Sequence, residues 1–216
     1  DVSAARLAAL RNLPVYRQAL EGNSLKDVLT AARKLQGPAA LMKGATPMTL
    51  EEYNVLVARG SLCCRQALVL CWLRAARTAD VLALRAGSLW REGNQLCIEL
   101  GSEKAKNLGI PGFVTVALPP REALLLAPLI ASRPPLTAPS KRPPLLPLTY
   151  DQFRSYILTN RPSNSTITPH SMRKGAVLRM LQAGRSLRDI SLVTQHRSVA
   201  GLMAYVTCLD LHTQAR

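Results

Sequence analysis

Apolar residues recur along most of this chain at the three- and four-residue spacing that is typical of helices buried on one side. Thr49 and Glu52 form a capping box, which should open a helix of about ten residues. A later helix is expected over residues 169–183, with Thr168 as its cap and Gly184 as its stop. The same pattern predicts further helices over residues 61–75, 78–84 (with Thr78 as cap), 121–130, 149–160, 186–194 and 198–206.

Strand-like sequence occurs in one region. Residues 95–100 and 113–118 alternate apolar and polar side chains or carry β-branched ones, and segment 101–112 should join them as a long hairpin. Residues 132–147 contain six of the fifteen prolines, which predicts an extended surface connection outside the core. The predicted fold class is therefore mainly α with a small antiparallel β-sheet (α+β).

The chain should comprise one main domain and a smaller flanking piece. Its 216 residues, 48% of them apolar, suffice to bury a core. Gly-Pro at 37–38 and Lys-Gly-Ala-Thr-Pro at 43–47 are typical of a linker. We therefore expect the main domain over residues 46–216, preceded by a helical segment, 1–45, that is either the remnant of an N-terminal domain or an arm packed on the main one.

Positive charge dominates the composition. The chain has 28 Lys and Arg against 13 Asp and Glu, for a net charge of +15. The charge is spread along the chain instead of gathering in one tail, which indicates a folded basic surface that contacts phosphates. A nucleic acid is the favoured partner, and an anionic membrane surface and a ribosomal context are the alternatives.

The cysteine pattern favours a reduced, intracellular protein. The count of five is odd, and no cysteine lies in a C-x-x-C pair or near a His at metal spacing, so the cysteines are expected to be reduced and to hold no metal. The longest apolar runs, such as 67–73 and 123–130, are well short of the roughly 18 residues of a membrane span.

The segment Thr-Pro-His-Ser-Met-Arg-Lys-Gly at 168–175 carries the most informative motif. On a helix that begins at Pro169, His170 and Arg173 project from the same face near the first turn. Free backbone amides favour a phosphate at that end, and a guanidinium can bind two of its oxygens. Alone, H-x-x-R is a weak signal, because a lone His is more often a capping or core residue.

The residues that follow make the motif specific. His196 lies 23 residues after Arg173, and Tyr205 lies nine residues after His196. In order and spacing these residues, with Ala-Gly at 183–184, resemble the C-terminal motif of the tyrosine recombinase (phage integrase) family. That family has H-x-x-R, a helix ending in Ala-Gly, a Gly-His dipeptide and a nucleophilic Tyr. The resemblance spans residues 46–205 and implies the family's catalytic-domain fold.

The family also has an Arg on an upstream helix. An acidic residue follows three residues after this Arg, and a Leu follows seven residues after it. Arg77, Asp80 and Leu84 match this pattern. Arg74 does not match it, because Arg77 occupies its i+3 position.

The remaining family residue is a Lys in the turn between two strands. Lys104 is favoured, because its place five residues before Gly109 resembles the hairpin of recombinases from some mobile elements, and Lys106 is the alternative. The chain departs from the family at Glu103, where that hairpin has Ser, and at Gln195, where Gly is usual. Lys174 and Asp80 stand where His and Glu are commoner.

The resemblance implies DNA strand breakage and rejoining without ATP or metal. Arg77 and Arg173 would clamp the phosphate, and Tyr205 would attack it to give a 3′-phosphotyrosyl link that a 5′-hydroxyl later reseals. Tyrosine needs help with its proton at neutral pH, and His170 is the candidate base.

Two more residues complete the implied site. Lys104 would protonate the leaving hydroxyl, and His196 would bind the phosphate or orient the tyrosine. Each residue also has a simpler interpretation: Arg77 and Asp80 as a surface i,i+3 pair, Lys104 as a solvated lysine and Tyr205 as a core residue. His212 has no matching role and is interpreted as part of the tail.

Two other functions compete with recombination. A type IB topoisomerase uses similar residues, although it usually carries Lys where this chain has His170. The other alternative is a non-catalytic DNA-binding relic of a mobile element. The recombinase interpretation implies double-stranded DNA as partner and a tetramer on two DNA sites in the full-length protein. The DNA target, and the choice among integration, excision, resolution and transposition, stay open.

Overall fold

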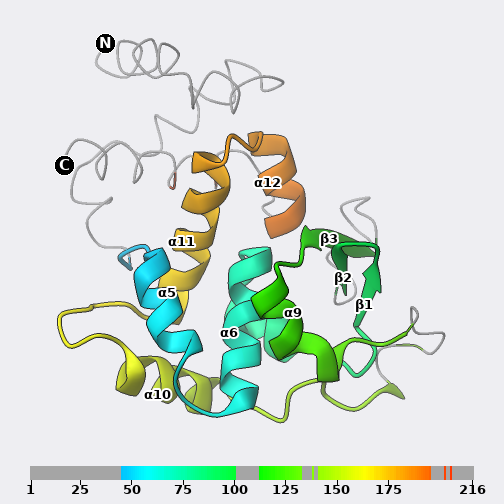
Figure 1. Ribbon diagram of the computed structural model, residues 1–216, viewed down its shortest axis with the longest axis horizontal. Helices are drawn as coiled ribbons and strands as arrows, with labels where there is room; N and C mark the ends of the chain where they lie inside the picture. Colours follow the sequence, from blue (N-terminus) through cyan, green and yellow to red (C-terminus); the bar gives the residue numbers. More distant parts are fainter. Residues whose placement is uncertain are drawn as a thin grey trace. The chain divides into compact units, whose positions relative to one another are not determined.

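The computed structural model describes residues 45–100, 112–132, 138, 141–195, 202 and 205. The chain divides into two compact units, Thr46–Ala176 and Val177–Arg216 together with Asp1–Ala45. The domain limit expected between residues 45 and 46 stays a prediction. Figure 1 labels most of the elements of the described part.

The Thr46–Ala176 unit is mainly helical with one small sheet, as predicted. Its elements are α5 (Leu50–Val57), α6 (Leu62–Arg74), α7 (Thr78–Leu82), β1 (Leu89–Glu92), β2 (Gln95–Glu99), β3 (Phe113–Ala117), α9 (Pro120–Leu126), the 3-10 turn η1 (Ala127–Leu129), α10 (Tyr150–Asn160) and the first half of α11 (Pro169–Gln182).

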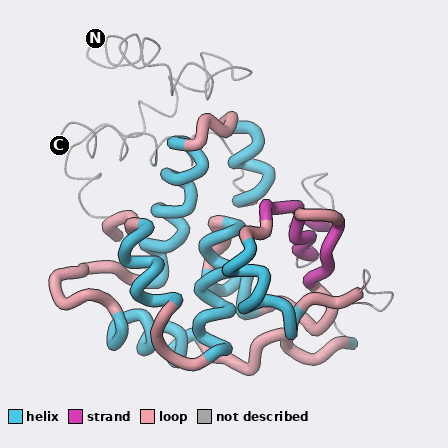
Figure 2. Tube along the Cα trace, in the orientation of Figure 1, coloured by secondary structure: helices cyan, strands magenta, loops and turns pink. Residues whose placement is uncertain are grey.

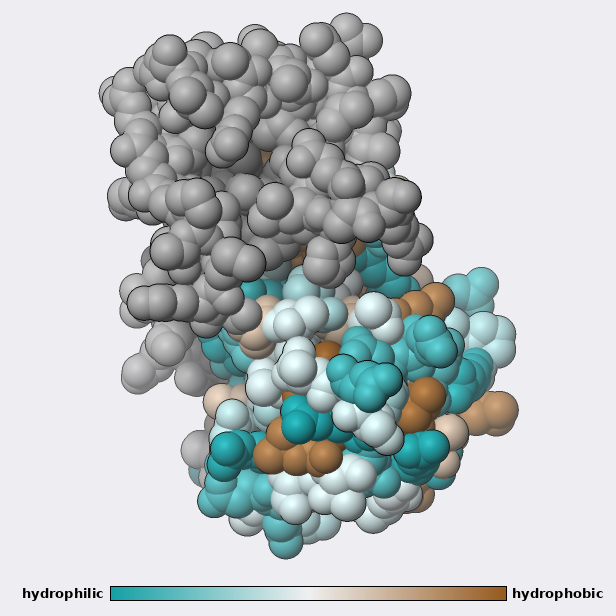
Figure 3. Space-filling view, turned by 90° about the vertical axis from the view of Figure 1, so that its left-hand side faces the viewer, coloured by the Kyte–Doolittle hydropathy of each residue, from teal (hydrophilic) through white to brown (hydrophobic). Residues whose placement is uncertain are grey.

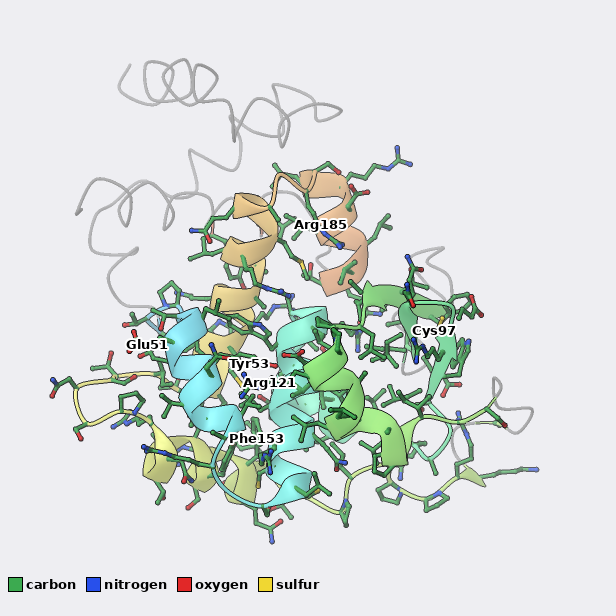
Figure 4. The ribbon with its side chains drawn as sticks, viewed as in Figure 1. Glu51, Tyr53, Cys97, Arg121, Phe153 and Arg185 are labelled. Atoms are coloured by element: carbon green, nitrogen blue, oxygen red, sulfur yellow. The ribbon has the colours of Figure 1, made fainter. Side chains whose placement is uncertain are left out.

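Helix α6 is the centre of this unit. Residues 67–73 of this helix are all buried, and α5, α9 and α10 pack against it (Figure 1). Tyr53 of α5 stacks on Trp72 of α6, with ring centroids 4.7 Å apart, and its hydroxyl donates to Glu122 of α9 at 3.0 Å. Figure 4 labels Tyr53 and Arg121 where α5 and α9 meet.

The helix caps follow the sequence closely. The predicted capping box is present: Thr49 N–H donates to Glu52 Oε2 at 2.8 Å, and Glu52 N–H donates to Thr49 Oγ1 at 3.1 Å. Thr78 was expected to cap the next short helix, and that prediction is wrong, because Arg77 is the N-cap and Thr78 is the first helical residue.

The sheet has three antiparallel strands in the order β1-β2-β3 (Figure 2). Strands β2 and β3 confirm the predicted pair, with Cys97 opposite Thr115. Strand β1 was not predicted, because Leu-Trp-Arg-Glu is too short to show alternation; it pairs with β2 with Trp90 opposite Cys97. Segment 101–111, predicted as the connection, lies outside the described residues.

The expectation that residues 132–147 stay outside the core is wrong for their last part. Arg142, Leu145 and Leu146 are buried. The Leu145 N–H donates to the Leu84 carbonyl at 2.9 Å, so this stretch satisfies its backbone by pairing with residues 84–86. Arg142 also forms a 2.5 Å ion pair with Glu99 at the end of β2.

The unit that includes Val177–Arg216 contains the second half of α11 and helix α12 (Leu187–Thr194). Gly184 ends α11 at φ +74°, as predicted, and Ser186 caps α12 by accepting from the Asp189 N–H at 3.1 Å. Of the predicted helix 198–206, the structure describes Leu202 and Tyr205, and both are helical.

Figure 3 shows one face, on which the hydrophobic areas of the described part are small and lie among hydrophilic ones. Scattered apolar side chains of this kind are usual on a solvated surface. No helix within the described ranges has the length and apolar character that a membrane crossing requires.

Candidate active site

The turn between α6 and α7 carries the upstream arginine. Arg77 is its last residue and the N-cap of α7, with extended backbone. The Arg77 side chain is 55% exposed, and its Nη1 lies 3.9 Å from Asp80 Oδ2, as the i,i+3 spacing predicts. Such an exposed pair is weak, so the Arg77 guanidinium can exchange this contact for an anion.

Arg173 of α11 reaches the same turn from the other end of the sequence. It is 2% exposed, and its Nη1 donates to the Ala75 carbonyl at 3.0 Å. Ala75 ends α6 in the left-handed region, at φ +51°. This conformation turns the chain after α6 and leaves the Ala75 carbonyl, one of the unpaired acceptors of a helix end, to the guanidinium.

The backbone of α11 near its start packs closely against the backbone of Met48. The Met48 N–H donates to the Ser171 carbonyl at 3.0 Å. A Cβ on Gly175 would lie 2.0 Å from the Met48 carbonyl oxygen and 2.9 Å from a Trp72 ring carbon. Only glycine permits this approach, and it fixes the helix that carries Arg173.

His170 faces the same positive charges. Partial burial lowers the pKa of its imidazole from the usual 6.5, and the charges of Lys174, Arg173 and Arg77 lower that pKa further. A lowered pKa favours the neutral imidazole, which is the form that accepts a proton.

Arg74 lies at the same turn, and sequence reasoning did not assign it to the site. Its side chain is buried, and burial lowers its pKa to about 10. The charge of Asp80 raises that pKa, whereas those of Arg173 and Arg77 lower it. The sequence signal was an arginine that directly follows the apolar run 67–73 on the same helix.

The described structure thus brings together Arg77, His170 and Arg173, three of the six predicted residues. Lys104, its alternative Lys106 and His196 lie outside the described residues. Tyr205 belongs to the other unit, where it is helical and its side chain is 7% exposed. The predicted roles of Lys104, His196 and Tyr205 stay predictions.

The residue before His196 is Gln195, which stands where the family resemblance leads one to expect Gly. Gln195 caps α12 in the left-handed region at φ +55°. Glycine adopts this conformation without strain, which accounts for the Gly-His dipeptide that is usual in the family.

Comparisons with known protein families and with characterised proteins find no match to this sequence. Solved structures do match. The XerA recombinase superposes with a TM-score of 0.56 at 14% identity, over 99% of this chain and 88% of that one. The Tn1549 transposon integrase in complex with transposon right end DNA gives 0.56 at 13% identity, over 94% and 87%.

A third structure is the XerH site-specific recombinase bound to its difH substrate. It gives a TM-score of 0.51 at 15% identity over 74% of this chain, which spans 50% of the XerH chain. All of these neighbours are tyrosine recombinases or integrases. The chain therefore has the fold of the tyrosine recombinase catalytic domain, as its sequence motifs predicted.

Proposed function

We propose that this chain breaks and rejoins DNA strands through a 3′-phosphotyrosyl intermediate, as a site-specific tyrosine recombinase. The observation that carries the proposal is the convergence of Arg77, Arg173 and His170 at one turn of the Thr46–Ala176 unit. Two guanidiniums and a neutral imidazole match the needs of phosphoryl transfer, where charge grows on the non-bridging oxygens.

The chemical step follows from these groups. The Tyr205 phenol oxygen attacks phosphorus, which forms the tyrosyl ester and breaks the bond to the 5′-oxygen. His170 takes the phenolic proton, and Lys104 or Lys106 gives a proton to the leaving 5′-oxygen. His196 donates a hydrogen bond to the phosphate or orients the phenol. Arg77 and Arg173 hold the phosphate throughout, and the ester keeps the energy of the broken bond for resealing.

Two features support double-stranded DNA as the partner. The chain carries a net charge of +15, and the neighbouring structures of XerH and the Tn1549 integrase were solved with their DNA. From the family resemblance, the full-length protein would act as a tetramer on two DNA sites in a mobile element.

Covalent selection from random DNA tests the proposal and reveals the target sequence at the same time. Radiolabelled nicked duplexes with a randomised segment are incubated with the protein, and DNA that stays attached after denaturation in detergent is recovered. The unmodified protein should accumulate attached DNA, and Tyr205→Phe should not. A chain that binds DNA without attachment would be a binding relic.

A second assay separates recombination from topoisomerase activity. Once a target is selected, the protein is given either one supercoiled plasmid or two paired target sites. Exchange of flanking DNA between paired sites supports a recombinase. Relaxation of supercoils with no exchange would instead assign a type IB topoisomerase.

A further inference from the structure

Lys174 is a cation beside the candidate site that the proposed mechanism does not use. It follows His170 by four residues on α11, so the two side chains lie one turn apart on the same face of that helix. Among the charges that lower the pKa of His170, that of Lys174 has the largest effect. The Lys174 ammonium therefore lies close to the imidazole of the candidate base.

The three cations that act on His170 differ in how they are already bound. Arg173 is 2% exposed and donates to a backbone carbonyl, and Arg77 lies 3.9 Å from the carboxylate of Asp80. Lys174 is half-buried, and no carboxylate of the described residues lies within ion-pair distance of its ammonium. A lysine is charged at neutral pH, so this ammonium can bind an anion from outside the chain.

The place of Lys174 suits a phosphate next to the scissile one. In the proposed mechanism, Arg77 and Arg173 already hold the two non-bridging oxygens of the scissile phosphate. Phosphates of one DNA strand follow each other at about 3.4 Å of rise along the duplex axis. One turn of an α-helix is about 5.4 Å long, so a lysine one turn from a group at the scissile phosphate reaches the next phosphate with its flexible stem.

We infer that Lys174 binds the DNA phosphate adjacent to the scissile one and thereby fixes the strand against the reacting atoms. This inference rests on the proposed function. Lys174 is a substrate-binding residue that moves no proton, and its contact with the backbone sets the register of the DNA without reading a base. The sequence is consistent with this role, because Lys174 stands where the family more often has the shorter His.

Neutral methylphosphonates test the contact one phosphate at a time. Target duplexes carry a single methylphosphonate either at the scissile position or at a phosphate beside it. Cleavage is measured at low protein concentration and at about pH 8.5, where a histidine is neutral. On natural DNA, Lys174→Met should slow cleavage about tenfold, the effect of one hydrogen bond between charged groups.

For the unmodified protein, a methylphosphonate at one adjacent phosphate should slow cleavage by a similar factor. The two changes together should cost little more than either alone, because both remove the same contact. Independent losses at every adjacent phosphate, or coupling at the scissile phosphate instead, would overturn the inference.

A conservative variant separates binding from an effect on the neighbouring histidine. Lys174→Arg keeps the charge and should retain cleavage of natural DNA within about threefold. Equal losses in the Arg and Met variants would show that the packing of the lysine stem matters and its charge does not. If Lys174 acted only through the titration of His170, Lys174→Met would cleave at the unmodified rate at about pH 8.5. Either result overturns the inference.

The salt dependence of DNA binding gives a readout that needs no cleavage. Loss of one phosphate contact should lower the slope of log affinity against log salt concentration by about 0.9. Lys174→Met should show this change on duplex DNA. Arg65→Met is the matched control: it also removes one positive charge, but the Arg65 Nε donates to the Val57 carbonyl at 2.6 Å near the start of α6, so its slope should not change.

The slope also distinguishes the failure of this inference from the failure of the proposed function. A protein that binds duplex DNA but becomes attached to none would refute the proposed function, and the slope of Lys174→Met would still decide the role of Lys174. Equal slopes in the unmodified protein and in Lys174→Met would overturn the phosphate contact.

Discussion

Replacement of Gly175 by alanine tests how α11 positions Arg173. The added Cβ would lie 2.0 Å from the Met48 carbonyl oxygen, so one of the two backbones must move by more than about 1 Å. Overpacking of this kind costs about 1–3 kcal/mol. Loss of the 3.0 Å bond from Met48 N–H to the Ser171 carbonyl adds about 1 kcal/mol, and the higher helix propensity of alanine returns about 1 kcal/mol.

The expected net effect of Gly175→Ala is a loss of about 1–3 kcal/mol in the free energy of unfolding, or roughly 2–12 °C in melting temperature for a chain of this size. Urea unfolding followed by circular dichroism measures it. Gly112→Ala is the matched control, because its Cβ would meet nothing within 4 Å, and it should be neutral or slightly stabilising. Equal stabilities of the two variants would refute the close approach of α11 to residue 48.

Three further predictions concern charge and backbone strain. Lys174→Gln removes a positive charge that lowers the pKa of His170, so this pKa should rise toward its usual value. The acid limb of the pH profile of cleavage should then move to higher pH. An unchanged titration of His170 by NMR would contradict this prediction. Glu99→Ala leaves the buried Arg142 guanidinium without its carboxylate partner, and it should lower the free energy of unfolding, measured in urea, by about 3–5 kcal/mol. A loss below about 1 kcal/mol would show that this ion pair does not stabilise the fold. Gln195 has left-handed backbone, so Gln195→Val should destabilise by about 1–2 kcal/mol relative to Gln195→Gly, and equal melting temperatures would show that this turn is relaxed.

The sequence predicted the helices well because their signals are local. The boxes at Thr49–Glu52 and Thr149–Gln152 each place a cap three residues from its partner, and Gly184 meets a positive φ that favours glycine. Strand β1 and the burial of Leu145 and Leu146 escaped prediction for the opposite reason. Both depend on pairing with distant segments, and a proline-rich stretch carries no local sign that its leucines fill a core.

The candidate site likewise contains residues that local sequence patterns predict and one that they do not. The motif around His170 and Arg173 was readable because its spacing along the chain is fixed. Arg74 was passed over because it failed the i+3 pattern that selected Arg77. Its burial near Arg173, Arg77 and Asp80 depends on contacts between distant segments, which local sequence patterns do not predict.

The central claim is that Tyr205 forms the covalent link to DNA, and mass spectrometry of the trapped adduct tests it most directly. Trypsin cleaves after Arg197, so residues 198–216 are released as one peptide in which Tyr205 is the single tyrosine. After nuclease digestion, we expect a nucleotide remnant on that tyrosine through its phosphate. A remnant on any other residue, or none on a chain that has cleaved DNA, would contradict the account.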